Sequence, residues 1–498
     1  MRNIKENIEI CTQFAVRHGL CAPADAPLVR NRLLSLFRLD APFEGDIDLP
    51  DSLVPVLEEM VDYAAEASLL EMNTPTYRAM LDNTICACLL MMPSQTEEKF
   101  FSLYRQSPQK ATDWFYTLCR DVNYIRTFDV AKNILFDYNS AYSKMEITIN
   151  LTKPEKDPRE IEKQKIMPQT NYPKCMLCLE NVGYPGRLGY PSHETLRVIP
   201  ITLDGERWYF QYSPYVYYNE HCIVFCEKHT PMTMDRRKFV RLFEFLHLFP
   251  HYFIGSNTQL PVVGGSILAH EHFQGGRHDM PMALAKPKYT FSVGDPLVKA
   301  QVVDWPMTCL RLTGKDDQKI IPIAARILET WQNYDDPAMT IYSHTDREHN
   351  TITPIVRING AGEYECDIVL RNSLTTEELP LGVFHPHPDK HNIKKENIGL
   401  IEVMGMFILP GRLKTELETV AQCWFHNSDL PDDSVHRAWY ESFRYARRPK
   451  SLEEAKEELK TLVGGVCENV LRDASVFKDD DAGQAGLKRF LRACGFEV

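Results

Sequence analysis

The hydrophobic pattern of this chain changes its period twice, and this change limits the fold more than any other feature. In the first 143 residues, apolar side chains recur every three or four positions, which indicates helices packed on one side. The clearest stripe consists of Leu53, Val56, Leu57, Met60, Val61 and Ala64. Short β-rich runs separated by helical stretches follow as far as about residue 425, and the helical spacing then returns. We therefore expect an α+β protein with helical ends.

Several short segments predict individual elements. Residues 146–151 alternate with period two, which is typical of a strand, and residues 208–212 and 222–226 also predict strands. Residues 261–268 predict a short buried strand entered through a tight glycine turn, and residues 235–248 predict a helix. Ser451 followed by Glu454 fits a capping box and predicts the start of a C-terminal helix.

The length of 498 residues exceeds a single ordinary core, so more than one domain is expected. We predict a helical N-terminal region over 1–143 and a first α+β half over 144–300. A second α+β half over 301–430 and a helical C-terminal region over 431–498 complete the chain. The two halves each contain a pair of histidines one residue apart, which hints at a duplicated unit.

Charge and composition exclude several classes of protein. The net charge of −12 argues against a nucleic-acid-binding protein, and no apolar run is long enough to span a bilayer. The N-terminus lacks the apolar segment of a secretory signal, so the 14 cysteines are expected to be reduced thiols. We expect a cytoplasmic protein that acts on small molecules, without nucleic-acid or membrane partners.

The segment at residues 270–276 carries the strongest chemical signal. It places His270, His272 and Gln274 at alternate positions, so their side chains share one face if the backbone is extended. Gly275 and Gly276 follow, and glycine allows a backbone to approach an anion closely. A neutral imidazole beside a hydrogen-bond donor and bare amides suits covalent transfer of a phosphorus group. A solvated histidine-rich loop or a metal-binding histidine pair is the alternative interpretation.

Signatures of other enzyme classes are missing. The chain has no zincin motif, no phosphate-binding P-loop, no dinucleotide-binding glycine fingerprint and no zinc-deaminase motif. These absences leave a histidine nucleophile as the main enzymatic interpretation.

Three further groups of residues are candidates for binding. Cys175 and Cys178 form a C-x-x-C pair, which is a redox pair, half of a zinc site or two buried thiols. Lys153 and Lys156 follow a predicted strand and suit a diphosphate, although a solvated charged loop explains them as well. The third group, residues 385–391, contains three histidines and suits a metal or a sugar phosphate, or forms an exposed turn.

Three long phrases give the chain a specific resemblance. Residues 264–276, 349–355 and 395–405 are similar to phrases of the hexose-1-phosphate uridylyltransferases, in the longer of two bacterial branches. This family belongs to the histidine-triad superfamily, and the resemblance covers the full length. It implies a histidine-triad-like antiparallel-sheet core, duplicated over 144–300 and 301–430, with helical extensions.

The family motif H-x-H-x-Q implies the catalytic residues. His272 matches the nucleophile and Gln274 matches the glutamine that hydrogen-bonds the covalent intermediate. The shorter branch holds a structural zinc, and the corresponding ligands here are Cys175, Cys178, His229 and His270. No organic cofactor is implied.

Substrate-binding residues are implied in the same way. Lys153 and Lys156 stand where the shorter branch has two arginines on the UDP phosphates, with the same charge but without the bidentate fork. Asn257 resembles a nucleotide-binding asparagine, and Lys395 with Gly399 and Glu402 resembles a stretch that holds the hexose phosphate. The full set of substrate-binding candidates is Lys153, Lys156, Asn257, Gly275, Gly276, Lys395 and Glu402.

The chain departs from the shorter branch in two places. His385 and His387 match only part of its second metal site, so iron is not predicted. The uridine-binding loop of that branch is not recognisable, and residues 211–215 are the candidate replacement.

The resemblance implies a nucleotidyltransferase of galactose metabolism that exchanges UMP between UDP-glucose and galactose 1-phosphate through a uridylyl-histidine. One alternative is a nucleotide hydrolase or dinucleoside-polyphosphate phosphorylase of the same superfamily. Another is a non-catalytic binding module with a structural metal site. A homodimer is compatible with either enzyme.

Overall fold

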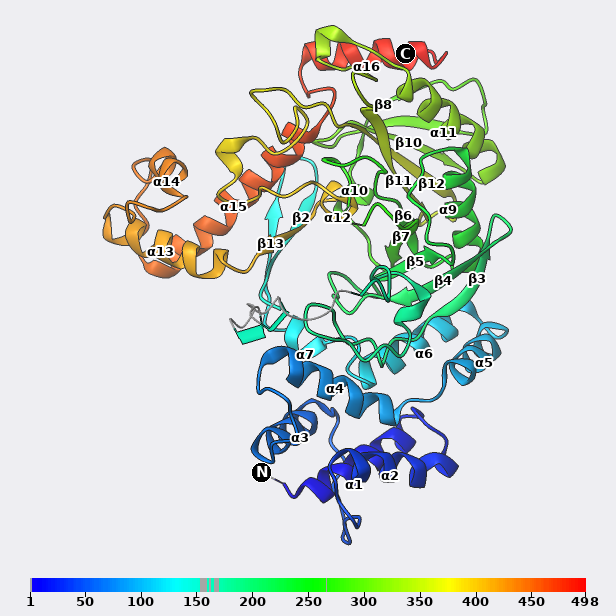
Figure 1. Cartoon of the computed structure of the whole chain (residues 1–498). Coiled ribbons are helices and arrows are strands. Elements are labelled where there is room, and N and C mark those ends of the chain that lie inside the picture. The colour runs from blue at the N-terminus through cyan, green and yellow to red at the C-terminus, as the bar shows by residue number, and fades with distance from the viewer. Residues whose placement is uncertain (1, 153–158, 161–162, 165–169, 266) are drawn as a thin grey trace. The chain divides into compact units, whose positions relative to one another are not determined.

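The computed structural model describes residues 2–152, 159–160, 163–164, 170–265 and 267–498 (Figure 1). Contacts within the chain divide it into two compact units. Unit 1 comprises residues 1–132, 153–202 and 206–229, and unit 2 comprises residues 133–152, 203–205 and 230–498. The candidate functional residues belong to both units, and each unit is described by itself.

Unit 1 begins with helices, as the spacing of apolar residues predicts. Their bounds are α1 Ile4–Arg17, α2 Ala26–Leu36, α3 Val54–Glu66, α4 Pro75–Leu89, α5 Pro93–Tyr104, α6 Pro108–Asp121 and α7 Thr127–Val130, with short 3₁₀ turns at Pro23–Asp25 and Leu179–Asn181. The predicted stripe of α3 is confirmed, since five of its residues are buried in that helix and the sixth, Leu53, is buried at its N-cap.

The strands of unit 1 also match the prediction. They are β3 Ile199–Leu203, β4 Glu206–Tyr212 and β5 Cys222–Cys226, and β4 pairs antiparallel with β5. Phe115 of α6 packs on this pair, with its ring centroid 5.9 Å from that of Phe210 and 5.3 Å from that of Tyr212. Aromatic side chains therefore join the helices of the unit to its strands.

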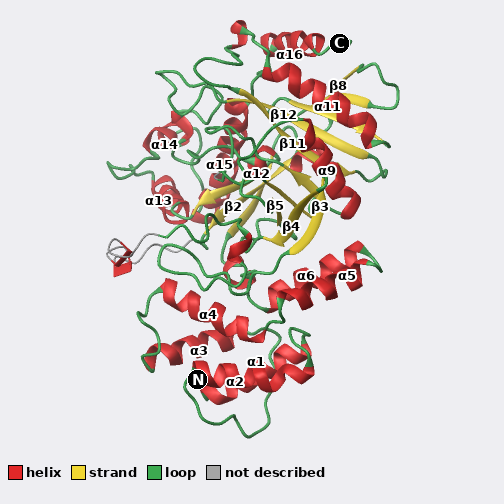
Figure 2. Cartoon of the chain, turned by 45° about the vertical axis from the view of Figure 1, so that its right-hand side comes forward, coloured by secondary structure: helices red, strands yellow, loops and turns green. Residues whose placement is uncertain are grey.

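Unit 2 contains two groups of strands (Figure 2). The larger group runs in the order β7-β6-β11-β12-β10-β9-β8, and its described pairs are antiparallel. In the smaller group β2 pairs antiparallel with β1 and parallel with β13. The strands are β1 Ile134–Asn139, β2 Lys144–Asn150, β6 Phe253–Gly255, β7 His272–Gly276, β8 Pro287–Phe291, β9 Lys299–Val303, β10 Cys309–Gly314, β11 Asn350–Ile358, β12 Tyr364–Asn372 and β13 Met406–Pro410. The predicted antiparallel α+β architecture is thus confirmed.

The helices of unit 2 are fixed to these strands by buried side chains. Trp331 of α11 donates from Nε1 to the carbonyl oxygens of Thr351 and Arg371, at 2.9 and 3.0 Å. The helices are α9 Arg236–Leu248, α10 Pro281–Leu284, α11 Asp317–Gln332, α12 Leu400–Val403, α13 Leu413–His426, α14 Arg437–Phe443, α15 Leu452–Ala474 and α16 Asp481–Ala493, with 3₁₀ turns at Pro337–Met339 and Pro388–Lys390. Among the described residues, no helix combines the length and the apolar character that crossing a membrane requires.

Two local predictions are corrected. Residues 261–264 form bends, and the other described residues of 261–268 have no regular structure, so the predicted strand is absent from the described part of this segment. Val262 has φ of +72°, which breaks an extended run, and a Cβ on Gly264 would lie within 2.8 Å of the carbonyl oxygens of Thr258 and Leu260. Strand β1 lies at the end of the region expected to be helical, and its alternating burial shows the period of a strand.

The start of α15 is confirmed, although its capping box is only half formed. The Ser451 hydroxyl accepts a hydrogen bond from the Glu454 backbone N–H at 3.1 Å. The Glu454 carboxylate accepts from the backbone N–H of Lys450 instead of that of Ser451. The N-cap is therefore Ser451, as the motif implies, while the Glu454 carboxylate binds the residue before it.

Candidate functional site

The strand β7 holds the core of the H-x-H-x-Q motif. His272 opens the strand and Gln274 follows two residues later, so their side chains share one face as predicted. His270 lies in a bend just before the strand, so the alternation does not extend to it. The antiparallel partner is β6, with Ile254 opposite Gly275.

The glycine at position 275 has a packing role. A Cβ at this position would lie 2.3 Å from the carbonyl oxygen of Phe253 in β6 and 2.9 Å from the side chain of Ile254. Since real Cβ atoms do not approach so closely, a larger residue would push β7 away from β6. Gly275 thereby fixes the position of the strand that begins with His272.

The His272 ring is held in one orientation by its own backbone. The side chain is 5% exposed, and Nδ1 lies 2.8 Å from the carbonyl oxygen of His270. A carbonyl oxygen can only accept, so the proton of the neutral ring resides on Nδ1. The lone pair is consequently on Nε2, the atom available for attack on phosphorus.

The surroundings keep this imidazole neutral. Burial lowers the pKa of His272 to about 4, and the positive charges of Lys238 and protonated His270 act in the same direction. The hydrogen bond to the His270 carbonyl opposes this shift but does not outweigh the burial. At neutral pH the ring is therefore an uncharged nucleophile.

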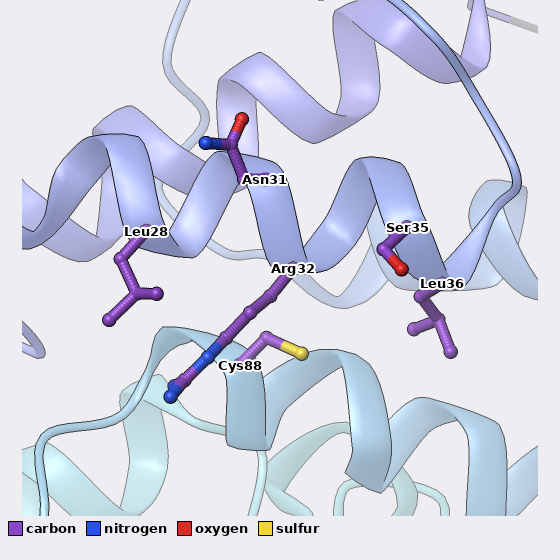
Figure 3. Close-up of a pocket in the computed structure, with 6 residues that line it drawn as sticks. All are labelled: Leu28, Asn31, Arg32, Ser35, Leu36 and Cys88. Carbon is purple, nitrogen blue, oxygen red and sulfur yellow. The ribbon is translucent and has the colours of Figure 1, made fainter.

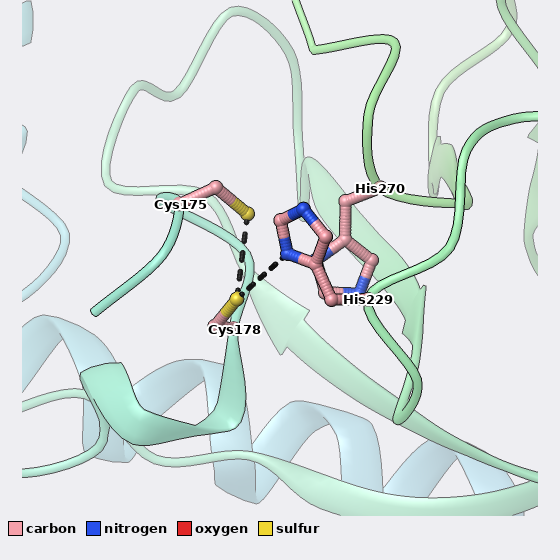
Figure 4. A group of neighbouring side chains, drawn as sticks. All are labelled: Cys175, Cys178, His229 and His270. Atoms are coloured by element: carbon pink, nitrogen blue, oxygen red, sulfur yellow. Dashed lines mark hydrogen bonds between the residues drawn. The ribbon is translucent and has the colours of Figure 1, made fainter. Parts of the chain in front are cut away.

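The four predicted zinc ligands form a group of neighbouring side chains (Figure 4). Their ligand atoms, from Cys175, Cys178, His229 and His270, all lie within 4.8 Å of one another. The two sulfur atoms are 3.6 Å apart, and the Cys178 Sγ lies 3.1 Å from Nδ1 of His229. Two sulfurs bound to one tetrahedral zinc lie about 3.8 Å apart, so the donor set and its spacing fit this metal.

A hydrogen-bond network fixes the loop that carries the two cysteines. The Asn181 side-chain amide donates to the carbonyl oxygens of Cys175 and Cys178, both at 2.8 Å. The Tyr190 hydroxyl in turn donates to the Asn181 amide oxygen at 2.7 Å, and the Arg187 guanidinium lies over the Tyr190 ring. This support could not be predicted from the sequence, because its members share no recognisable motif.

Asn257 and Glu402 both engage the first turn of α12. The Asn257 side-chain oxygen accepts from the Leu400 backbone N–H at 2.8 Å. The Glu402 carboxylate accepts from the Gly399 backbone N–H at 3.1 Å and from Lys394 Nζ at 2.9 Å. Both predicted substrate-binding residues thus also order this short helix.

The lysine that faces the protein interior here is Lys394. Its side chain is 4% exposed, whereas the predicted residue Lys395 is exposed. Two adjacent lysines cannot be told apart by a sequence pattern, because α12 and its preceding loop decide which one points inward.

Arg371 is a buried cation that the motif analysis missed. Its Nη2 donates to the Ile398 carbonyl at 2.8 Å and its Nη1 to the Thr353 hydroxyl at 3.3 Å, while its buried Nε has no hydrogen-bond partner among the described residues. Burial lowers the pKa of this guanidinium to about 10. The sequence feature that could have identified Arg371 is a charged residue at the end of the apolar run that forms β12.

His385 and His387 have neighbours outside the H-x-H-x-Q motif. His385 Nε2 lies 3.1 Å from the Asn397 side-chain oxygen, and His387 Nε2 lies 3.2 Å from the Val383 carbonyl. Gln211 is buried within β4, and Tyr215 beyond it is exposed. Gly276 closes β7 opposite Phe253. Lys153 and Lys156 lie outside the described residues.

A cavity of about 450 Å³ lies in the helical part of unit 1 (Figure 3). None of the predicted site residues lines it. Its walls come from α2 and α4 and consist of Leu28, Asn31, Arg32, Ser35, Leu36 and Cys88. Burial raises the pKa of the Cys88 thiol to about 11, so this wall offers no reactive thiolate at neutral pH.

A neutral histidine with its lone pair on Nε2 has the chemistry of the class of enzymes that use a histidine nucleophile. Comparisons with known proteins narrow this class. Residues 20–231 match the N-terminal domain of galactose-1-phosphate uridyl transferase, and residues 245–441 match its C-terminal domain. The chain therefore belongs to the galactose-1-phosphate uridylyltransferase family.

Individual relatives match along the whole chain. The galactose-1-phosphate uridylyltransferase of Caldanaerobacter subterraneus is 45% identical, over 99% of this chain and 98% of the relative. That of Bacillus subtilis is 42% identical, over 99% and 98%. Among solved structures, yeast Ap4A phosphorylase Apa2 in complex with Ap4A gives a TM-score of 0.31 at 12% identity, covering 57% of this chain and 87% of the yeast chain. The family assignment rests on the full-length relatives.

Proposed function

We propose that this protein exchanges UMP between UDP-glucose and galactose 1-phosphate. The observation that carries the proposal is the His272 ring, which is neutral and has its proton on Nδ1 and its lone pair on Nε2. This ring stands in a chain that matches galactose-1-phosphate uridylyltransferases over their full length. The activity belongs to galactose metabolism by the Leloir pathway.

The reaction proceeds by two displacements at the same phosphorus atom. In the first, His272 Nε2 forms a bond to the α-phosphorus of UDP-glucose, and the bond to the bridging oxygen breaks, which releases glucose 1-phosphate. In the second, a phosphate oxygen of galactose 1-phosphate attacks the uridylyl-histidine, and the nitrogen–phosphorus bond breaks. UDP-galactose leaves and the neutral imidazole is restored.

Charge neutralisation and positioning carry most of the catalytic burden in such transfers. We assign the hydrogen bond to the uridylyl intermediate to Gln274. The nucleotide and its phosphates are assigned to Asn257, Gly275, Gly276, Lys153 and Lys156. Lys395 and Glu402 are assigned to the hexose phosphate. These assignments rest on the family motifs.

We further assign a structural zinc to Cys175, Cys178, His229 and His270. The ion would join the C-x-x-C loop to the residue whose carbonyl orients His272, and it would hold the thiolates in charged form. His270 would then carry a metal on its ring and a hydrogen bond on its carbonyl.

The test of the proposed function uses UDP-glucose labelled in the α-phosphate. Wild-type protein should retain label as a uridylyl group in the absence of galactose 1-phosphate and release it as UDP-galactose when that sugar phosphate is added. His272→Ala should retain none and lose exchange by several orders of magnitude. His426→Ala, at an exposed histidine of α13, is the control and should behave like the wild type.

Two results would contradict the proposal. Near-normal exchange by His272→Ala would show that His272 is not the nucleophile. Release of the label to water or inorganic phosphate, unaffected by galactose 1-phosphate, would instead indicate a hydrolase or a phosphorylase.

A further inference from the structure

A buried ion pair holds the residue between the two motif histidines. Glu271 is buried between His270 and His272, and its side chain is 4% exposed. Its carboxylate pairs with the ammonium group of Lys238, a residue of α9 whose side chain is completely buried. The pair therefore ties the first turns of α9 to the residue just before β7.

Three separate contacts converge on Glu271. Besides the contact with Lys238, its second carboxylate oxygen accepts a hydrogen bond from the Thr233 backbone N–H at 2.8 Å. Its own backbone N–H donates to the Thr230 carbonyl at 2.8 Å. The segment from Thr230 to Lys238 thus grips both the backbone and the side chain of this one residue.

Lys238 makes two contacts through its ammonium group. It pairs with Glu271, and its Nζ also lies 5.1 Å from the ring centroid of Phe273, the residue after the nucleophile. Lys238 therefore contacts the residues on both sides of His272. A buried, hydrogen-bonded ion pair of this kind is costly to form and specifies one arrangement when every partner is satisfied.

We infer that the Lys238–Glu271 pair positions the nucleophile by fixing the His270–Glu271 peptide, whose carbonyl sets the tautomer of His272. The carbonyl oxygen of that peptide belongs to His270 and lies 2.8 Å from His272 Nδ1. If the peptide turns, this acceptor moves away from Nδ1, and both the ring orientation and the lone pair on Nε2 lose their definition. Lys238 and Glu271 are positioning residues, since neither is placed against the substrate. The inference rests on the proposed function and adds two residues to it.

The experiment compares single and double variants in the full-length protein. Glu271→Gln keeps the shape of the side chain but removes its charge, and Lys238→Met keeps its length but removes its charge. We expect kcat for exchange to fall by about 100-fold in each, the scale expected when a reacting group is misplaced by about 1 Å. The KM for UDP-glucose and the KM for galactose 1-phosphate should each change by less than about 3-fold, because the substrate contacts are untouched.

The double variant Lys238→Met/Glu271→Met separates positioning from folding. Two apolar side chains of similar volume can replace a buried ion pair without loss of stability. We therefore expect its thermal midpoint to return toward that of the wild type while kcat stays low, because the acceptor for the Thr233 N–H remains missing. Recovery of kcat together with the midpoint would overturn the inference and leave the pair a purely structural role.

A matched control uses a second buried carboxylate of unit 2. Asp367 of β12 is fully buried, and among the described residues its ion-pair partners are Arg311 and Arg357, which lie outside the motif. Asp367→Asn should lower the thermal midpoint but leave kcat per active site unchanged. An equal loss of kcat in this control would show that any buried charge defect disables the enzyme.

A spectroscopic measurement reports the tautomer directly. With ¹⁵N-labelled histidine, and His272→Ala to assign the signal, the wild type should show His272 protonated on Nδ1. Glu271→Gln should show a mixture of both tautomers, and an unchanged Nδ1-protonated signal would overturn the inference. If His272→Ala itself exchanged normally, the proposed function would fail instead, so the two failures are distinguishable.

Discussion

Single residues in this protein have properties that their type alone does not reveal. His272 and His193 are both buried, and burial lowers the pKa of each to about 4. For His272 the neutral ring serves chemistry. For His193 of unit 1, whose Nδ1 has no hydrogen-bond partner in the described part of the chain, the same shift lowers the stability of the folded protein in acid.

We predict that His193 makes the protein less stable in mildly acidic solution. Its folded-state pKa lies below the unfolded value of about 6.5, so the unfolded chain binds the proton more readily. The free energy of unfolding should therefore fall as pH drops from about 6.5 to about 4, by up to about 3 kcal/mol, and be unaffected above that range.

His193→Phe tests this prediction through the denaturation midpoint at about pH 7.5 and about pH 5. The variant should lose less stability between the two values than the wild type. His344→Phe, at an exposed histidine, should keep the wild-type difference. An identical acid response in His193→Phe and the wild type would refute the role of His193.

Some contacts of single residues cannot be predicted from sequence patterns. The H-x-H-x-Q spacing identified His272 and Gln274, because a strand places alternate residues on one face. The same reasoning could not choose between Lys394 and Lys395, nor show that Asn257 and Glu402 bind the start of α12. Such contacts depend on how distant segments fold together.

At the scale of elements, short segments support the functional groups. The 3₁₀ turn Leu179–Asn181 places Asn181 so that its amide donates to both cysteine carbonyls of the C-x-x-C loop. This arrangement orders the two sulfur atoms before any metal arrives. The loop therefore owes its shape to a side chain that binds no metal.

We predict that Asn181→Ala weakens zinc binding by about 10- to 100-fold, the usual effect of losing a residue that supports metal ligands. The measurement is competition for zinc with a coloured chelator. Asn359→Ala is the matched control, because Asn359 accepts two backbone N–H groups in the turn between β11 and β12. Equal zinc affinity in both variants would contradict the proposed support.

Patterns predicted elements well where they were regular. Strand β2 was located from its alternation, strands β4 and β5 from their β-rich runs, and helix α9 from a helical stretch. The region 261–268 was wrongly predicted as a strand, because its apolar residues pack from bends, one of them with positive φ. Close backbone approaches decided the conformation there, and such contacts leave no trace in hydrophobicity.

At the scale of the whole molecule, the proposed metal ion is predicted to stabilise folding. Binding an ion only in the folded state raises stability, and a structural zinc binds strongly at neutral pH. Purified protein should contain about one zinc per chain by elemental analysis. Prolonged chelation should lower the thermal midpoint and abolish uridylyl exchange, and zinc should restore both. A metal-free preparation with full stability and activity would show that the protein does not need the proposed zinc ion.

Two glycines place different limits on how this protein can change. At Gly464 of α15 a Cβ would strike the ring of Tyr138, whereas at Gly275 it would strike a main-chain oxygen. A Cβ at 464 would also lie 2.5 Å from the Cβ of Tyr138, so only glycine at 138 makes room for alanine at 464, and these two positions can change only as that pair. No exchange elsewhere can shrink a peptide group. The strand that contains His272 therefore needs glycine at position 275, whereas α15 can accept another residue at position 464 when residue 138 changes as well.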